Sequence, residues 1–364
     1  MNTAGRSRTS LRLCAAALLA STALLTACGH DHGGGMTPAN AADAPLSSDP
    51  ACQSLTPASQ GGPLPQGDTA VLRWLGTANY ELAYHGVIVI MDTYYDRPAR
   101  TAALGFTVPQ VTKANVILIG HAHSDHISDV AAVAAQTKAP VIGSAITTQE
   151  AQVLGVPAAQ TITVKGDNTE KFTYGDITIS PTHIIHSTIE AGLTTQLAAL
   201  YALDAPPLTP AEQQQHDAVS ARGSNDPNII TQGTMGFTFT FPNGFRIVWF
   251  DSVSNPSPEE NQLATNLAPG VDVGIFPWTP HPIAETQLTY TFQHLQLFKP
   301  KLFLPDHHDS IWGAWLDNGL SPLFTKIRDD LPGTRFAEPL YRSPICIRTT
   351  GNSRDDFYLG GMGT

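Results

Sequence analysis

The sequence predicts a layered domain of the α/β or α+β class. The chain has 364 residues, of which 42% are hydrophobic and only 14% are charged, enough for one large core or two modest ones. Short β-prone runs gather in two parts of the chain, 71–180 and 237–304, and helix-like stretches separate the later runs. Two β-rich halves with helices between them are typical of helices packed on β-sheets.

The first half opens like a β-meander. Its early strands are broken by Gly76 and by His85-Gly86, where tight turns are expected. Later strands alternate with helix-like stretches, one of them rich in alanine. The predicted strands are 71–75, 80–84, 87–91, 116–119, 141–142, 161–164, 172–174 and 177–180. The predicted helices are 128–138 and 147–154.

The second half begins near Gly236, where two apolar runs flank the turn Pro242-Asn243-Gly244. The predicted strands are 237–241, 245–250, 271–276 and 302–304, and the predicted helices are 258–267 and 285–298. Residues 191–235 break this rhythm, because they start apolar and then become rich in Pro and Gln. We interpret them as an insertion beside the functional site. A lid, a membrane-facing flap and a plain surface excursion all remain open.

The N-terminus has the features of a secretory signal. Basic residues precede the apolar stretch 13–25, which is too short for a comfortable transmembrane helix. The basic residues are Arg6, Arg8 and Arg12. The stretch ends in Leu25-Thr26-Ala27-Cys28, which resembles the lipobox of bacterial lipoproteins. The resemblance implies removal of residues 1–27 and lipidation of Cys28; the alternative is an ordinary signal peptide cut nearby.

The lipobox also implies a location and a tether. Gly29 follows Cys28 instead of an Asp, so we expect an anchor in the outer membrane of the bacterial cell envelope, facing the periplasm. Residues 28–68 are rich in Gly, Pro, Ala and Ser and predict a flexible tether. Apart from Cys14 in the signal peptide and Cys28, the cysteines are Cys52 and Cys346. In an oxidising compartment they could form a disulfide or stay unpaired, since sequence does not show their distance.

The strongest chemical signal is Gly120-His121-Ala122-His123-Ser124-Asp125-His126, which follows the apolar run 116–119. Three imidazoles and one carboxylate within six residues suit a transition-metal site, because both groups are good zinc ligands. A surface histidine cluster is the weaker interpretation, because a strand-to-helix loop would hold these groups rigidly. The segment therefore predicts a metal site.

The pattern His-x-His-x-Asp-His after a strand resembles the signature of the metallo-β-lactamase superfamily. The resemblance implies an α+β fold, the αβ/βα four-layer sandwich, over residues 69–350. Further positions match the family's pattern in order along the chain: Asp92 near the end of an early strand, and then His186, Asp251 and His307 as the later ligands. His183 is the alternative to His186, and Phe250 stands where the family usually has Gly.

The resemblance also implies roles for these residues. One metal ion would be held by His121, His123 and His186, and the other by Asp125, His126 and His307. Asp251 would bridge two divalent ions, with zinc expected and manganese or iron as alternatives. The ions would share a water and deliver it as hydroxide, and Asp125 would accept a proton during turnover. Asp92 would orient the histidine loop by hydrogen bonds, with His183 and His308 as neighbours of the ligands.

Within the superfamily, the stretch 74–79 and the sequence Pro305-Asp306-His307 look most like the branch of ascorbate-6-phosphate lactonase-like proteins and N-acylphosphatidylethanolamine phospholipase D. This implies a hydrolase of phosphodiesters, esters or lactones. The competing hypothesis is a non-catalytic ligand- or metal-binding envelope lipoprotein. A candidate for every ligand position favours the enzyme.

The charge balance bears on partners. The formal net charge is −11, and no Lys/Arg run is visible, so nucleic acid is not an expected partner. We expect a small-molecule or lipid-like substrate and contact with the membrane through the lipid anchor. The oligomeric state stays open.

Overall fold

The structure is a computed structural model that describes residues 45–188, 207–278, 284–309, 319–351 and 357–359. The contacts divide the chain into residues 1–39 and 40–364, and every described residue belongs to the second unit. The predicted signal peptide and Cys28 lie outside the described residues. Among the residues that are described, no helix is both long and apolar enough to span a membrane.

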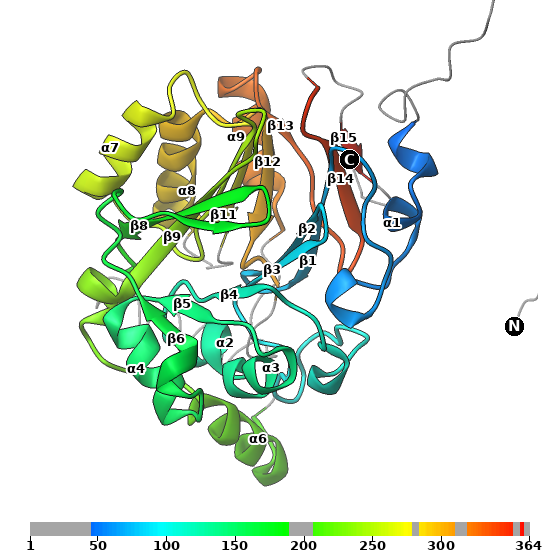
Figure 1. Cartoon of the computed structure of the whole chain (residues 1–364). Helices are drawn as coiled ribbons and strands as arrows, with labels where there is room; N and C mark the ends of the chain where they lie inside the picture. Colours follow the sequence, from blue (N-terminus) through cyan, green and yellow to red (C-terminus); the bar gives the residue numbers. More distant parts are fainter. Residues whose placement is uncertain (1–44, 189–206, 279–283, 310–318, 352–356, 360–364) are drawn as a thin grey trace, which may run out of the picture. The chain divides into compact units, whose positions relative to one another are not determined.

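Two β-sheets form the centre of the second unit (Figure 1). The first sheet contains β1 (Thr69–Gly76), β2 (Asn79–Tyr84), β3 (Val87–Met91), β4 (Val116–Leu118), β5 (Val141–Gly143), β6 (Thr161–Thr163), β14 (Pro344–Arg348) and β15 (Phe357–Leu359). Its strand order is β15-β14-β1-β2-β3-β4-β5-β6. The strands from β3 to β6 run parallel, and the other neighbours pair antiparallel.

The second sheet has the order β13-β12-β11-β10-β9-β8-β7. Its strands are β7 (Phe172–Tyr174), β8 (Ile177–Ile184), β9 (Thr234–Thr240), β10 (Arg246–Trp249), β11 (Val273–Pro277), β12 (Leu302–Asp306) and β13 (Arg335–Phe336). The strands from β10 to β13 are parallel. The carboxyl ends of parallel strands meet at one edge of a sheet, which is where ligands commonly bind.

Helices cover the outer face of each sheet, as Figure 1 shows. The helices at the first sheet are α2 (Ser124–Ile127), α3 (Val130–Thr137) and α4 (Ala145–Val153). The helices at the second sheet are α7 (Pro258–Asn266), α8 (Ala284–Phe298) and α9 (Ser321–Asp330). Inward-facing side chains of both sheets share one core between them, for example Leu72, Trp249 and Leu304. The predicted αβ/βα four-layer sandwich is confirmed.

The prediction of a flexible tether up to residue 68 is wrong from residue 45 onward. This segment forms η2 (Leu46–Ser48), α1 (Pro50–Gln53) and η3 (Ala58–Gln60). The buried carboxylate of Glu81 on β2 accepts hydrogen bonds from the backbone N–H groups of Ala58 (2.8 Å) and Ser59 (2.9 Å). The Gly- and Pro-rich composition suggested a linker, but partners on a distant strand order the segment.

A disulfide joins Cys52 of α1 to Cys346 of β14, with a Cα–Cα distance of 5.9 Å. Both cysteines are buried with Ala51 and Val71 on the outer face of the first sheet. Of the two states left open by the sequence, the structure contains the paired one. The N-terminal segment 45–68 is thereby linked to the last part of the fold.

The folded region is longer than the predicted 69–350. It begins before residue 69, and β15 lies beyond residue 350. The predicted insertion lies between β8, which ends at Ile184, and β9, which begins at Thr234. Its described part contains α6 (Pro210–Ser220) and the single π-helical turn η6 (Ile229–Gly233). The remaining short turns are η4 (Val108–Gln110) and η5 (Ala158–Gln160).

Candidate metal centre

The predicted ligands lie in loops that follow strands of both sheets. On the first sheet, Asp92 comes directly after β3, and the segment 121–126 leads from β4 into α2. On the second sheet, His186, Asp251 and His307 come after β8, β10 and β12. The fold brings these loops together where the two sheets meet, so that residues far apart in the chain form one cluster.

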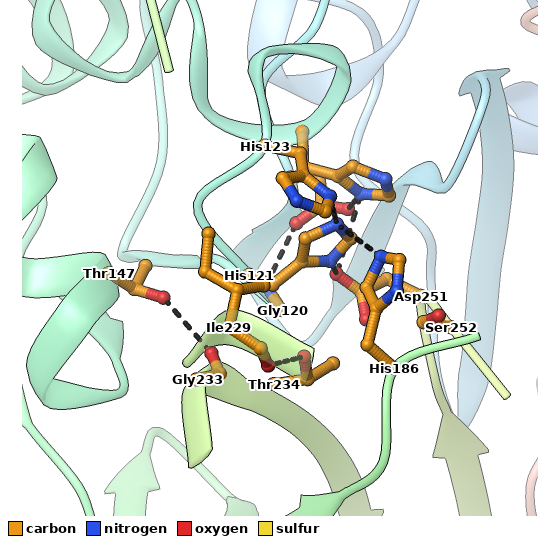
Figure 2. A network of polar contacts seen from close by, with 12 residues as sticks. Gly120, His121, His123, Thr147, His186, Ile229, Gly233, Thr234, Asp251 and Ser252 are labelled. Atoms are coloured by element: carbon orange, nitrogen blue, oxygen red, sulfur yellow. Dashed lines mark hydrogen bonds and ion pairs between the residues drawn. The ribbon is translucent and has the colours of Figure 1, made fainter. Parts of the chain in front are cut away.

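The first trio of donors consists of His121, His123 and His186. The Nε2 atom of His121 lies 2.9 Å from Nδ1 of His123 and 3.1 Å from Nε2 of His186 (Figure 2). The Nδ1 atom of His186 is 2.6 Å from the carbonyl oxygen of Ser187. If Nδ1–H donates there, Nε2 keeps its lone pair facing the other two rings, as a metal ligand must.

The second trio consists of Asp125, His126 and His307. The Oδ2 atom of Asp125 lies 3.3 Å from Nε2 of His307 and 3.5 Å from Nε2 of His126. The backbone of His307 has a positive φ of 53°, an uncommon conformation for a residue with a side chain. The trio thus depends on a turn that most residues would avoid.

Asp92 has the orienting position that the resemblance implied. Its Oδ1 accepts a hydrogen bond from the N–H of Gly120 (2.9 Å), and its Oδ2 lies 2.6 Å from Nδ1 of His126. A proton on Nδ1 leaves Nε2 of His126 free to face Asp125. The φ of Asp92 is +58°, so its backbone is also in the left-handed region. One buried carboxylate therefore holds both the start and the end of the histidine loop.

Asp251 links the two trios, because it forms a further group of possible metal ligands with His121 and His126. Its Oδ2 is 2.6 Å from Nδ1 of His121 and 3.4 Å from Nδ1 of His126, one residue from each trio. A side chain at Gly120 would collide with this carboxylate, since a Cβ there would lie 1.9 Å from Oδ2. Glycine at position 120 is required for this close approach.

Burial and neighbouring charges together set the charge states of these groups. Burial lowers the pKa of His121 and His186 well below the ordinary value, and neighbouring imidazoles lower the pKa further, so both rings are neutral at pH 7. Burial raises the pKa of Asp251 to about 6, although nearby imidazoles oppose this. For Asp125 burial also acts to raise the pKa, but the imidazoles around it prevail and hold the pKa well below its ordinary value. Neutral imidazoles and ionised carboxylates are the forms that bind metals.

The structure separates the two candidates for the third histidine. His186 belongs to the first trio, whereas His183 lies outside both. The Nε2 atom of His183 is 3.0 Å from the carbonyl oxygen of Thr231, and its Nδ1 is 3.6 Å from Glu259. His183 therefore contacts the base of the predicted insertion instead of the other ligands.

The described part of the insertion is built into the site. The N–H of His186 donates to the carbonyl oxygen of Ile230 in η6 (3.0 Å), and the N–H of Met235 donates to that of Gly120 (2.8 Å). Figure 2 shows this turn beneath the histidines, with Thr234 bonded to Ile229. The turn η6 contacts His186, and β9 after it contacts Gly120, so this end of the insertion packs against the loops that carry the first trio.

His308 lies beside the ligands but faces a different group. Its ring stacks on Trp74 with centroids 4.2 Å apart. Its ring nitrogens are buried and have no hydrogen-bond partner among the described residues. Burial lowers the pKa of His308 to about 4. His308 is therefore a neutral ring stacked on Trp74 and belongs to neither trio.

Sequence reasoning missed a group of residues next to His307: Thr77, Arg97, Asp309 and Tyr341. Asp309 accepts hydrogen bonds or ion-pair contacts from the other three. Asp309 stands only two positions after His307, which is the one local hint of its role. The contacts themselves join distant parts of the chain and leave no pattern in the sequence.

The donor set fits divalent metal ions. Imidazole nitrogens and carboxylate oxygens are the ligands of zinc and of related transition metals. Oδ1 of Asp251 and Nδ1 of His307 are buried and have no hydrogen-bond partner among the described residues. Buried polar atoms rarely remain without a partner, and a cation beside Asp251 would provide one.

No protein-family model matches the chain. A UPF0173 metal-dependent hydrolase from Cupriavidus necator is 32% identical over 117 residues, which is 30% of this chain and 40% of that protein. A UPF0173 metal-dependent hydrolase from Pyrobaculum islandicum is 28% identical over 116 residues, which is 32% of this chain and 50% of that protein. The matched stretches therefore span half or less of the length of these relatives.

The fold is shared more widely than the sequence. Igni18, a metallo hydrolase from Ignicoccus hospitalis, aligns with a TM-score of 0.53 at 14% identity, covering 77% of this chain and 98% of Igni18. With two sheets, helices on both outer faces and a shared core, the chain has the metallo-β-lactamase fold that the histidine motif suggested.

Proposed function

We propose that this protein is a metal-dependent hydrolase that holds two divalent ions in the two trios. The main observation behind this proposal is that all the predicted ligands, which come from separate loops of both sheets, meet in adjoining clusters. Similarity to curated metal-dependent hydrolases supports the same reaction class. When bound, such ions generate a nucleophile from water at neutral pH and polarise the substrate oxygen.

The chain's own residues would prepare the site for this chemistry. Asp92 orients His126 and the loop that carries His121. Asp125 is ionised and lies against His307, where it can accept a proton. Asp251 contacts His121 and would bridge the ions, or orient His121, through its two oxygens.

The substrate class and location belong to the same proposal. We infer a phosphodiester, ester or lactone substrate in the bacterial cell envelope, with the protein anchored through lipid on Cys28. The disulfide between Cys52 and Cys346 supports an oxidising compartment, because such bonds rarely persist in the cytosol. An unmodified Cys28 thiol, found by mass spectrometry of the protein from membranes, would remove the lipid anchor from this proposal.

Two histidines offer a matched test of the metal centre. His186→Ala and His183→Ala each remove one imidazole, and the two positions are only three residues apart. Only His186 belongs to a trio. Each protein is loaded with zinc or manganese, analysed for bound metal, and assayed on a chromogenic phosphodiester and a chromogenic lactone. We expect His186→Ala to lose metal and at least 100-fold in activity, while His183→Ala stays close to wild type.

The outcomes separate the hypotheses. Preference for the phosphodiester would support the phospholipase D-like members of the branch as its relatives. Preference for the lactone would support the lactonase-like members. Metal binding without turnover of either substrate would favour the non-catalytic envelope lipoprotein. Full metal content in His186→Ala would contradict the assignment of the first trio.

A further inference from the structure

A buried ion pair lies behind His307. The guanidinium of Arg97 contacts Oδ2 of Asp309 at 2.5 Å, and the two side chains are only 3% and 7% exposed. The hydroxyl of Tyr341 donates to the same oxygen (2.7 Å). Neither charge belongs to the trios of the metal centre. Removing a charged pair from water costs free energy unless hydrogen bonds compensate for the lost solvation. The position of this pair beside the metal centre therefore suggests a functional role.

Thr77 connects the ion pair to the metal centre. Its N–H donates to Oδ1 of Asp309 (3.0 Å), and its hydroxyl accepts from Arg97 (2.9 Å). Its carbonyl oxygen accepts the backbone N–H of His307 (2.7 Å) and the indole N–H of Trp74 (2.8 Å). The N–H and the carbonyl oxygen of Thr77 thus join the turn after β1 to the loop after β12, and its hydroxyl contacts Arg97.

Both ends of this connection have unusual backbone conformations. Thr77 has a φ of +50° and His307 a φ of +53°, in the region that residues with a side chain seldom adopt. For a β-branched residue such as Thr this is especially unfavourable. Such conformations persist only where the surroundings impose them, and they gather at functional sites. Here the surroundings are the contacts to Asp309 and Arg97.

The sequence also provides space for the guanidinium. Gly76 has a φ of +95°, and a Cβ there would lie 2.0 Å from a terminal nitrogen of Arg97. The turn between β1 and β2 is therefore shaped around this cation. Because β1 belongs to the first sheet and β12 to the second, the cluster joins the two sheets beside the metal centre.

We propose that Arg97 and Asp309 are positioning residues that hold His307, through Thr77, in the geometry needed to bind one metal ion. This inference rests on the proposed function. The effect is specific to the second trio, because His307 is part of it and none of the contacts of Thr77 described above reaches the first trio.

The test is a calorimetric titration of the full-chain, metal-stripped protein with Zn²⁺. We expect wild type to bind two ions. In Arg97→Gln and Asp309→Asn one ion should bind about 10- to 100-fold more weakly, as for other residues that orient metal ligands, while the other ion is unchanged. Titration with Co²⁺ should show the same selectivity. At a limiting Co²⁺ concentration, only the part of the visible absorption that comes from the weakened site should decrease.

A milder variant protects the test against misfolding. Tyr341→Phe keeps the ring stacked on Trp74 (4.5 Å) and removes only the hydroxyl that donates to Asp309. We expect a smaller loss for the same ion, about two- to tenfold. Tyr84→Phe is the matched control, because the hydroxyl of Tyr84 contacts Asp68 (3.4 Å) at a site remote from His307. This variant should bind both ions like wild type.

The experiment distinguishes a failure of the proposed function from a failure of the positioning role. If wild type binds no metal, the proposed function is overturned together with this inference. If wild type binds two ions and Arg97→Gln, Asp309→Asn and Tyr341→Phe bind both with unchanged affinity, only the positioning role is overturned. Equal weakening of both ions would also contradict it, because the contacts reach one trio.

Discussion

Phe250 occupies the position before Asp251, and its ring fills space beside Gly236 on the neighbouring strand β9. The ring is buried and packs against Phe276 and Phe298, with centroids 5.4 Å away in each case. A Cβ at Gly236 would lie 2.0 Å from the ring. A large residue thus precedes Asp251, and a glycine on the neighbouring strand accommodates its ring.

Gly236→Ala should therefore lower the free energy of unfolding by about 1–3 kcal/mol, because the surrounding aromatic rings leave Phe250 no room to shift. Urea unfolding of the variant and of wild type measures the loss. Phe250→Ala is destabilising by itself, but Gly236→Ala should cost much less in that background. An equal cost in both backgrounds would show that Gly236 does not serve to accommodate the ring.

At the scale of elements, helix α6 anchors the described part of the insertion. Thr209 and Glu212 form a capping box at its first turn, and Arg100 pairs with Glu212 at 2.6 Å. Beyond its end, Gly223 packs closely against Ser124 at the start of α2. The segment after the helix therefore supports the loop that carries Asp125 and His126.

The ion pair between Arg100 and Glu212 of α6 should depend on pH. The hydrogen bond from Arg100, with those from Thr209, lowers the pKa of Glu212 from 4.5 to about 2. Ionised Glu212 therefore stabilises the fold fully above about pH 4.5, and this contribution is lost as the pH falls through about 2. Glu212→Gln should have a lower melting temperature than wild type at pH 7, with a gap that narrows below pH 4.5. A gap that is constant from pH 7 to pH 3 would contradict this.

At the scale of the whole molecule, the candidate metal centre joins the two sheets. Asp92 and residues 121–126 come from the first sheet, whereas His186, Asp251 and His307 come from the second. Ions held by both groups would stabilise the packing of the sheets against each other, because the unfolded chain does not present the ligands together.

Removal of metal should therefore lower the melting temperature of the protein. A single ion present at 100 times its dissociation constant adds about 2.7 kcal/mol to the free energy of unfolding. Thermal unfolding with saturating zinc and after chelation measures the difference. The chelator should have a smaller effect on His186→Ala, and an identical melting temperature for wild type in both states would exclude a structural contribution of metal.

The sequence by itself determined the layered fold, the segment 121–126 and the later ligand candidates. These signals are local or periodic: strands and helices show in the spacing of apolar residues, and the motif places its donors within six positions. The resemblance to the metallo-β-lactamase superfamily, together with order along the chain, was enough to propose Asp92, Asp251 and His307, because each follows an apolar run that could be recognised as a strand.

Only the tertiary structure decided which neighbouring groups meet. It placed His186, and not His183, in the first trio, paired Cys52 with Cys346, and ordered residues 45–68. It also joined Thr77 to Asp309, which are 232 positions apart. Such contacts depend on how the whole chain packs, so they leave no trace in composition or spacing, and they supply the hydrogen bonds that position the ligands.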